Sequence, residues 1–152
     1  DEKEINPDLI AEWISEHARK YNIVKMAMDN NRYPLVARAL RAVGFDNDIK
    51  KNLVCVRPND IMRAVPVIES AFVNQRFAWG DYPPLRWAVR NTKKEIRGRK
   101  DGTDTGNFFY TKIESKSRKT DPWMSVVHGM CIESELDDYT EVVYGDVPAM
   151  TW

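Results

Sequence analysis

The chain is poor in the residues that cross-link or bind metals in small proteins. It has 152 residues and contains 2 cysteines and 2 histidines. Cys55 and Cys131 stand far apart in the sequence, each among apolar residues. A disulfide framework would need more cysteines, and a zinc site would need partner ligands at short spacing. We therefore interpret both as buried free thiols in a reducing compartment.

Long apolar runs and nucleotide-binding loops are also missing. No stretch approaches the ~18 apolar residues of a membrane helix, and nothing near the start resembles a secretory signal, so no membrane partner is expected. The chain has no internal repeat and no Gly-x-x-x-x-Gly-Lys-Ser/Thr phosphate loop. Hydrophobic residues make up 43% and charged residues 30%, which is typical of one folded domain. The first residue is Asp1 instead of Met, which indicates a piece of a longer protein.

The formal net charge of zero hides a segregation of charges. Residues 86–119 contain eleven Lys and Arg against four Asp and Glu, whereas residues 121–152 contain seven acids and no Lys or Arg. A basic stretch of this kind suits a surface that contacts phosphate. The alternative is a solvated face without a partner, and the pattern does not separate the two.

The apolar pattern of the first half predicts alternating helices and strands. Asn6-Pro7-Asp8 is a typical helix start, and Gly44 is suited to a left-handed helix end. The expected order is helix, strand, helix, strand, helix, which favours an α/β layer with parallel strands. The expected helices cover residues 6–20, 34–43, 58–72 (bent at Pro66) and 83–91, with strands at 23–28 and 53–56 and an extended piece at 77–79.

The second half has a different character. Residues 93–99 and 107–113 flank a Gly-containing polar tip, which predicts a hairpin. Thr120 is expected to cap a last helix that has Asp121 in its first turn. We therefore expect one domain over residues 1–136 and an acidic tail over residues 137–152.

Two acids stand at positions where chemistry is common. Asp29 ends a predicted buried strand, and Asp121 opens a helix after a basic segment. Carboxylates at such places can converge on one or two Mg²⁺ or Mn²⁺ ions, which would put them roughly 4–8 Å apart. The alternative is local: Asp29 forms a turn and Asp121 interacts with the helix dipole.

Several motifs in this order resemble the nuclease portion of phage large terminases. They are spread over about residues 9–136, which makes chance similarity a poor explanation. The segments that carry the resemblance are Ile23–Tyr33, Val56–Met62 with Pro66–Phe72, Pro84-Leu85-Arg86-Trp87 followed by Asn91, and the Lys-rich Lys112–Asp121.

The resemblance implies a ribonuclease H-like α/β fold, with a mixed sheet flanked by helices and the first strands missing at the N-terminus. It implies a metal-dependent endonuclease that cuts concatemeric DNA into genome lengths during packaging, in the host cytoplasm. Asp29 matches the second metal-binding acid of that family and Asp121 the third, with Mg²⁺ or Mn²⁺ as the cofactor. The first acid would lie upstream of this chain, and the family's ATPase motor is absent.

The partners that follow from the resemblance are double-stranded DNA, the portal and the small terminase subunit. Candidate DNA-binding residues flank the hairpin tip and precede Asp121: Arg97, Arg99, Lys100, Lys116, Arg118 and Lys119. The rival hypothesis is a non-catalytic module that docks onto the portal or the small subunit, with acids that only stabilise the fold.

Other candidates are weaker. His128 lies seven residues after Asp121, on the same helix face, but a lone helix histidine is more often packed or solvated. Trp79, Trp87 and Trp123 could stack on bases, although packing in the core or a groove is commoner. No Ser/His/Asp or Cys/His arrangement indicates a nucleophile.

Overall fold

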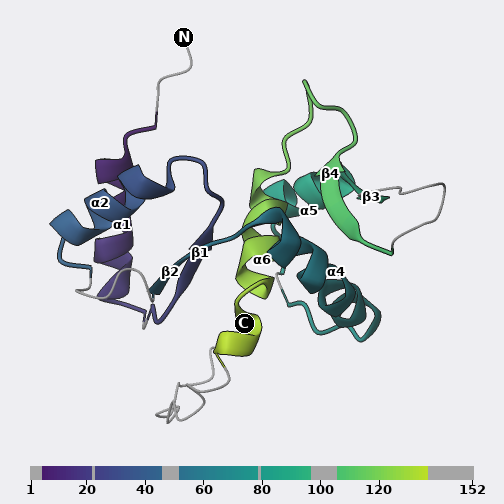
Figure 1. Ribbon diagram of the computed structural model, residues 1–152, viewed down its shortest axis with the longest axis horizontal. Helices are drawn as coiled ribbons and strands as arrows, with labels where there is room; N and C mark the ends of the chain where they lie inside the picture. Colours follow the sequence, from purple (N-terminus) through teal and green to yellow (C-terminus); the bar gives the residue numbers. More distant parts are fainter. Residues whose placement is uncertain (1–4, 22, 46–51, 79, 97–105, 137–152) are drawn as a thin grey trace.

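The protein is described by a computed structural model at residues 5–21, 23–45, 52–78, 80–96 and 106–136. These ranges form a mixed α/β structure, which confirms the expected α/β class (Figure 1). Its elements are α1 (Pro7–Ala18), β1 (Met26–Met28), α2 (Tyr33–Ala42), β2 (Leu53–Cys55), α4 (Pro58–Val73), α5 (Pro83–Arg90), β3 (Thr92–Ile96), β4 (Phe108–Lys112), α6 (Asp121–Met130) and the short 3₁₀ helix η1 (Glu133–Glu135). The acidic tail expected at 137–152 lies outside the described residues.

Most of the predicted helix ends are confirmed because their signals are local. The Asn6 side chain accepts a hydrogen bond from the Asp8 amide at 3.0 Å, so it caps α1 as expected. Gly44 follows α2 with a φ of 75°, the left-handed conformation that favours glycine. Thr120 departs from the prediction. Its side chain makes no capping hydrogen bond to α6, and the residue is buried in the junction before the helix.

The described strands form two separate sheets. β1 pairs in parallel with β2, with Met26 opposite Leu53, and β3 pairs antiparallel with β4. Helix α6 lies between the two sheets and packs against β1 (Figure 1). The predicted parallel strands and the predicted hairpin arms are thus both confirmed, but the described residues do not join them into the single central sheet that we expected. The extended piece expected at 77–79 is not a strand at Phe77 and Ala78, and residue 79 lies outside the described residues.

Two hydrophobic clusters lie on opposite sides of this arrangement. One joins α1, α2 and β2, through Ala11, Ala37, Ala39, Leu40 and Leu53. The other joins α4, α5 and α6, through Ala64, Ile68, Leu85, Ala88, Trp123 and Val127. Trp123 is 2% exposed, which confirms the interpretation that it packs in the core over the one that it stacks on bases. Helix α6 thus anchors in the second cluster while it also contacts β1 of the other half.

Both cysteines are free thiols, as predicted, but they are half-buried instead of buried. Burial raises the pKa of the Cys131 thiol to about 11, which keeps it protonated and unreactive at neutral pH. In the described ranges, no helix is long and apolar enough to cross a membrane.

Candidate active site

Asp29 follows the last residue of β1 and is exposed. One of its carboxylate oxygens, Oδ1, accepts a hydrogen bond from the Asn31 amide at 2.9 Å. This is the side-chain-to-backbone bond of an Asx turn, so the turn-forming role considered for Asp29 is confirmed. Because the bond uses only Oδ1, the carboxylate keeps acceptor capacity for a ligand.

Asp121 is the first residue of α6, and the buried Asn91 holds the chain that leads to it. Asn91 is 3% exposed and follows the last residue of α5. Its side-chain Nδ2 donates to the Lys119 carbonyl at 3.3 Å, and its carbonyl accepts from the Ile113 amide at 2.8 Å. Asn91 therefore fixes both ends of the loop between β4 and α6. Asn91 belongs to a motif of the resemblance, but the sequence did not indicate this structural role.

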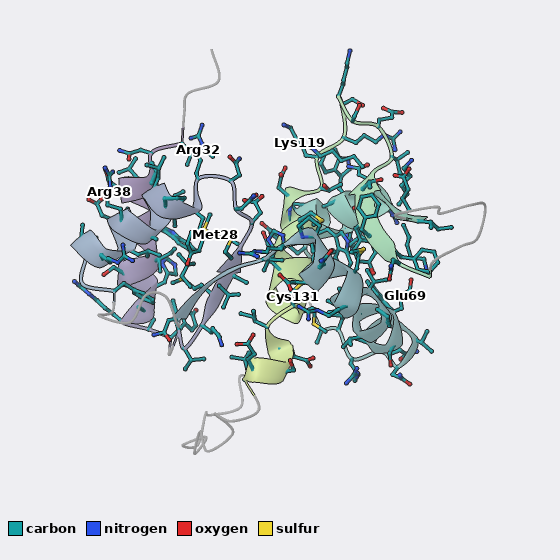
Figure 2. The ribbon with its side chains drawn as sticks, viewed as in Figure 1. Met28, Arg32, Arg38, Glu69, Lys119 and Cys131 are labelled. Atoms are coloured by element: carbon teal, nitrogen blue, oxygen red, sulfur yellow. The ribbon has the colours of Figure 1, made fainter. Side chains whose placement is uncertain are left out.

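Asp29 and Asp121 line the same pocket, although their elements are far apart in the sequence. The pocket has a volume of about 220 Å³ and lies between the end of β1 and one face of α6. Met28, labelled in Figure 2, lies on the β1 side of this junction. The lining residues are Ala27, Met28, Asp29, Asp121, Met124, Ser125 and His128. The fold thus brings the two predicted acids to one cavity, and their carboxylate separation of roughly 4–8 Å stays a prediction.

His128 is the residue of this pocket that the sequence interpretation set aside. It is half-buried on α6. Burial lowers its pKa below the ordinary value, and the negative charge of Asp29 partly opposes that shift. The ring is therefore mainly neutral at pH 7 and carries a free nitrogen lone pair. The sequence signal that could have placed His128 in this pocket is its seven-residue spacing from Asp121, since that spacing puts both residues on one helix face.

The donors of this pocket suit a hydrated divalent ion. Mg²⁺ and similar ions keep several waters and are often held by one or two carboxylates. A cavity of about 220 Å³ is large enough for an ion together with several of its waters. In the part of the chain that the structure describes, no three His, Cys, Asp or Glu side chains are gathered closely enough to hold an ion together. An ion in this pocket would therefore be held by Asp29 and Asp121 alone, with water completing its shell.

The basic residues predicted to contact DNA are described in part. Lys116, Arg118 and Lys119 are exposed in the loop that precedes α6, where Figure 2 labels Lys119. Arg118 forms an ion pair with Glu114 at 3.6 Å. Arg97, Arg99 and Lys100 lie outside the described residues. The loop cations thus precede Asp121 directly and border the same end of α6.

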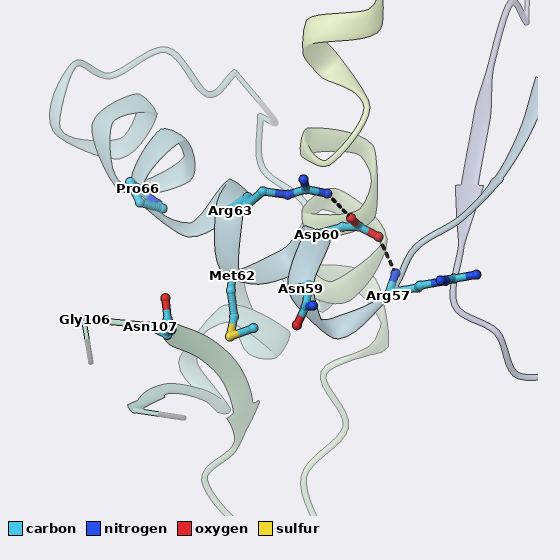
Figure 3. A pocket seen from close by; sticks show the side chains of 8 residues that line it. All are labelled: Arg57, Asn59, Asp60, Met62, Arg63, Pro66, Gly106 and Asn107. Carbon is cyan, nitrogen blue, oxygen red and sulfur yellow. Dashed lines mark hydrogen bonds and ion pairs between the residues drawn. The ribbon is translucent and has the colours of Figure 1, made fainter. Parts of the chain in front are cut away.

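A second, larger pocket lies at the start of α4 (Figure 3). Its volume is about 710 Å³, and its one acid among the lining residues is Asp60. The Asp60 carboxylate accepts a hydrogen bond from the Arg57 amide at 2.8 Å and pairs with Arg63. The bond from the Arg57 amide, with help from Arg63, holds the pKa of Asp60 below its usual value. Both carboxylate oxygens are engaged, so this pocket lacks a free acid for a metal.

Protein-family models, curated proteins and solved structures give no match to this chain. The geometry of the Asp29 and Asp121 pocket and the motif resemblance are therefore the two grounds on which a function can be argued.

Proposed function

We propose that this chain is the nuclease portion of a phage large terminase with a ribonuclease H-like fold, and that it cuts double-stranded DNA with Mg²⁺ or Mn²⁺. One observation carries the proposal. Asp29 and Asp121 were assigned from two separate motifs, and they line one pocket. Local turn and dipole roles alone give no reason for two distant acids to meet in this way.

The residues of the pocket have separate roles in this proposal. Asp29 and Asp121 hold the divalent ion, which, when bound, supplies an activated water and stabilises the leaving oxygen of the phosphodiester. Asn91 acts as a positioning residue, because its hydrogen bond to the Lys119 carbonyl fixes the chain just before Asp121. Lys116, Arg118 and Lys119 contact the phosphate backbone, which favours cutting with little dependence on sequence.

In the intact protein, this activity would cut concatemers into genome lengths during packaging in the host cytoplasm. Its partners would then be the portal and the small terminase subunit, besides double-stranded DNA. The family's first acid, expected upstream of this chain, would complete the set of metal ligands.

A docking module is the second candidate function, and a different surface favours it. Ile5, Leu9, Trp13 and Tyr21 lie four or eight positions apart on and around α1, with exposed fractions of 67%, 63%, 59% and 65%. Contiguous exposed apolar groups of this kind often mark protein interfaces. In that case the portal or the small subunit would cover α1, and the two acids would serve the fold alone.

Metal binding tests the nuclease proposal against the docking one. We expect Mn²⁺ to bind weakly, because two carboxylates supply few of the oxygens that such an ion needs. Asp29→Asn and Asp121→Asn should each weaken Mn²⁺ binding about 10-fold or more, measured by electron paramagnetic resonance (EPR) titration. The control is Asp81→Asn, which removes an exposed acid paired with Arg86 outside the pocket. A wild-type chain that binds no Mn²⁺ would contradict the nuclease proposal and favour docking.

DNA binding by the loop cations should depend steeply on salt. Replacing Lys116, Arg118 and Lys119 together with Ala should lower the slope of log affinity against log salt by about 2.7, because each lost phosphate contact contributes ~0.9. The loss should be alike for all DNA sequences, and fluorescence anisotropy with duplexes of different sequence measures it. The double variant Arg19→Ala with Lys20→Ala, at the end of α1, should leave the slope unchanged.

The acidic residues 137–152 offer an alternative partner for those cations. If these acids neutralise the loop, a chain without residues 137–152 should bind DNA more tightly than the full chain. A chain that binds no DNA at low salt, with or without those residues, would leave the basic stretch as a solvated face.

A further inference from the structure

One surface of α1 carries a continuous stripe of apolar and aromatic side chains, each four residues from the next and therefore beside it on the helix. Its members are Ile5, Leu9, Trp13, His17 and Tyr21. All of them except His17 are exposed, whereas Ala11 on the opposite face is buried in the cluster with α2. Figure 1 shows α1 beside α2 at the end of the molecule away from α4. The stripe is therefore open to a partner along roughly 25 Å, given the helical rise of ~1.5 Å per residue.

The aromatic part of this stripe is already ordered. The rings of Trp13 and His17 are stacked with centroids 3.8 Å apart, and the Tyr21 ring lies 6.5 Å from that of His17 at an interplanar angle of 12°. His17 Nδ1 donates a hydrogen bond to the Trp13 carbonyl at 2.8 Å, which fixes the His17 ring between the other two. Side chains that are held in place before binding lose little conformational entropy when a partner covers them. The stripe is thus suited to binding as it stands.

A row of acids runs along one side of the stripe. Asp8, Glu12 and Glu16 are exposed and also lie four residues apart. Asp8 pairs with Arg38 of α2 at 3.6 Å, but within the described ranges Glu12 and Glu16 have no ion-pair partner. Like charges at this spacing repel each other along a helix, so cations supplied by a partner would offset a local cost. The charges beside the stripe therefore favour a basic partner.

The same acids make other occupants of this surface unfavourable. DNA and anionic membranes carry negative charge, which Glu12 and Glu16 would repel. A second copy of this chain also fits poorly. Trp13 is the midpoint of the stripe, so a two-fold contact centred there would bring the two glutamates close to their counterparts, where like charges weaken an interface.

We propose that α1 binds an amphipathic helix of another protein, whose apolar side covers Trp13 and its neighbours and whose Lys or Arg side chains face Glu12 and Glu16. Long basic side chains suit this place, because their aliphatic stems pack on apolar groups while their charged ends reach the acids. Arg19 and Lys20 follow the end of α1, so the partner's cations should lie opposite the preceding turns. The inference rests on the docking role considered for α1 and is independent of the metal pocket, which is built from β1 and α6.

The experiment measures the binding of the whole chain to three fluorescently labelled helical peptides of about 20 residues, which are long enough to cover the stripe. The peptides share one leucine stripe and differ only in the residues beside it, which are Lys, Gln or Glu. By fluorescence anisotropy at low salt, the Lys peptide should bind about 10-fold more tightly than the Glu peptide, with the Gln peptide between them. High salt should reduce this difference, because the acids are exposed.

Trp13→Ala tests whether the peptide lies on the stripe. It should weaken binding of the Lys peptide about 10-fold or more, since a tryptophan at the centre of an interface commonly dominates its affinity. Trp87→Ala removes another exposed tryptophan, on α5, and should change the affinity less than about 2-fold.

A charge reversal on α1 tests the choice of partner. Glu12→Lys combined with Glu16→Lys should invert the preference, so that the Glu peptide becomes the tightest of the three ligands. A folding defect cannot produce such a gain of binding. Asp81→Lys reverses an exposed acid away from α1, which pairs with Arg86, and should keep the wild-type order.

The contrary outcomes differ in what they overturn. Equal affinities for the three peptides, all lost in Trp13→Ala, would overturn the basic partner and keep α1 as a docking surface. The absence of binding to any peptide, or binding that Trp13→Ala does not weaken, would overturn the inference entirely. Single-stranded DNA or anionic vesicles that bound the wild type but not Trp13→Ala would overturn it by assigning the surface to another class of ligand. The Mn²⁺ titration tests the metal pocket separately, so neither result decides the other.

Discussion

Asp29→Asn and Asp121→Asn should each slow the nicking of supercoiled plasmid by about 100-fold or more in the presence of Mn²⁺. Each substitution removes one of two charged donors from the pocket, and a loss of ~3 kcal/mol of transition-state stabilisation corresponds to a factor of about 100. The wild-type rate itself should be low, since two carboxylates hold a divalent ion weakly. Agarose gel separation of nicked from supercoiled plasmid, at several Mn²⁺ concentrations, measures the effect.

The same assay includes a control variant, and one outcome of it would contradict the proposed site. Asp81→Asn should nick plasmid at the wild-type rate, because Asp81 pairs with Arg86 and does not line the pocket. Removal of the ion with EDTA should stop nicking in every variant. If both pocket variants nicked plasmid as fast as the wild type, the activity would come from elsewhere and the site would be rejected.

The parts of the fold that the sequence predicted correctly depend on local chemistry. Asn6 caps α1 and Gly44 ends α2 because a side chain or a left-handed backbone satisfies groups one turn away. Asp29 at the end of β1 and Asp121 at the start of α6 follow from the same kind of signal, namely an apolar run or a helical pattern with a sharp boundary. Positions of single acids on elements were therefore predictable from the sequence.

What the sequence did not predict depends on tertiary packing. The parallel pair and the hairpin were predicted, but their separation into two sheets with α6 between them was not, because no local pattern encodes it. Threonine often caps helices, but Thr120 is buried in the junction before α6, and its hydroxyl makes no capping hydrogen bond. His128 was ranked low because a lone helix histidine is more often packed or solvated, and its place beside Asp29 follows only from β1 lying against α6. Features of this kind can be predicted only when the contacts between elements are known, and a single sequence does not supply those contacts.

Trp123→Ala should destabilise the protein by about 3–5 kcal/mol, the usual cost of emptying a buried aromatic site. Trp123 is 2% exposed, and its ring lies 5.5 Å from that of Phe72 and 5.6 Å from that of Tyr110, centroid to centroid. The Ala variant would lose these contacts and leave a cavity between α4, β4 and α6. Urea denaturation followed by circular dichroism measures the cost, and Trp87→Ala, at a position 49% exposed, should lose no more than about 1 kcal/mol.

Because α6 carries Asp121, any molecules of Trp123→Ala that remain folded should also bind Mn²⁺ less tightly than Trp87→Ala. Equal unfolding free energies for the two variants would contradict the view that Trp123 anchors α6, and with it the view that this anchor positions the pocket.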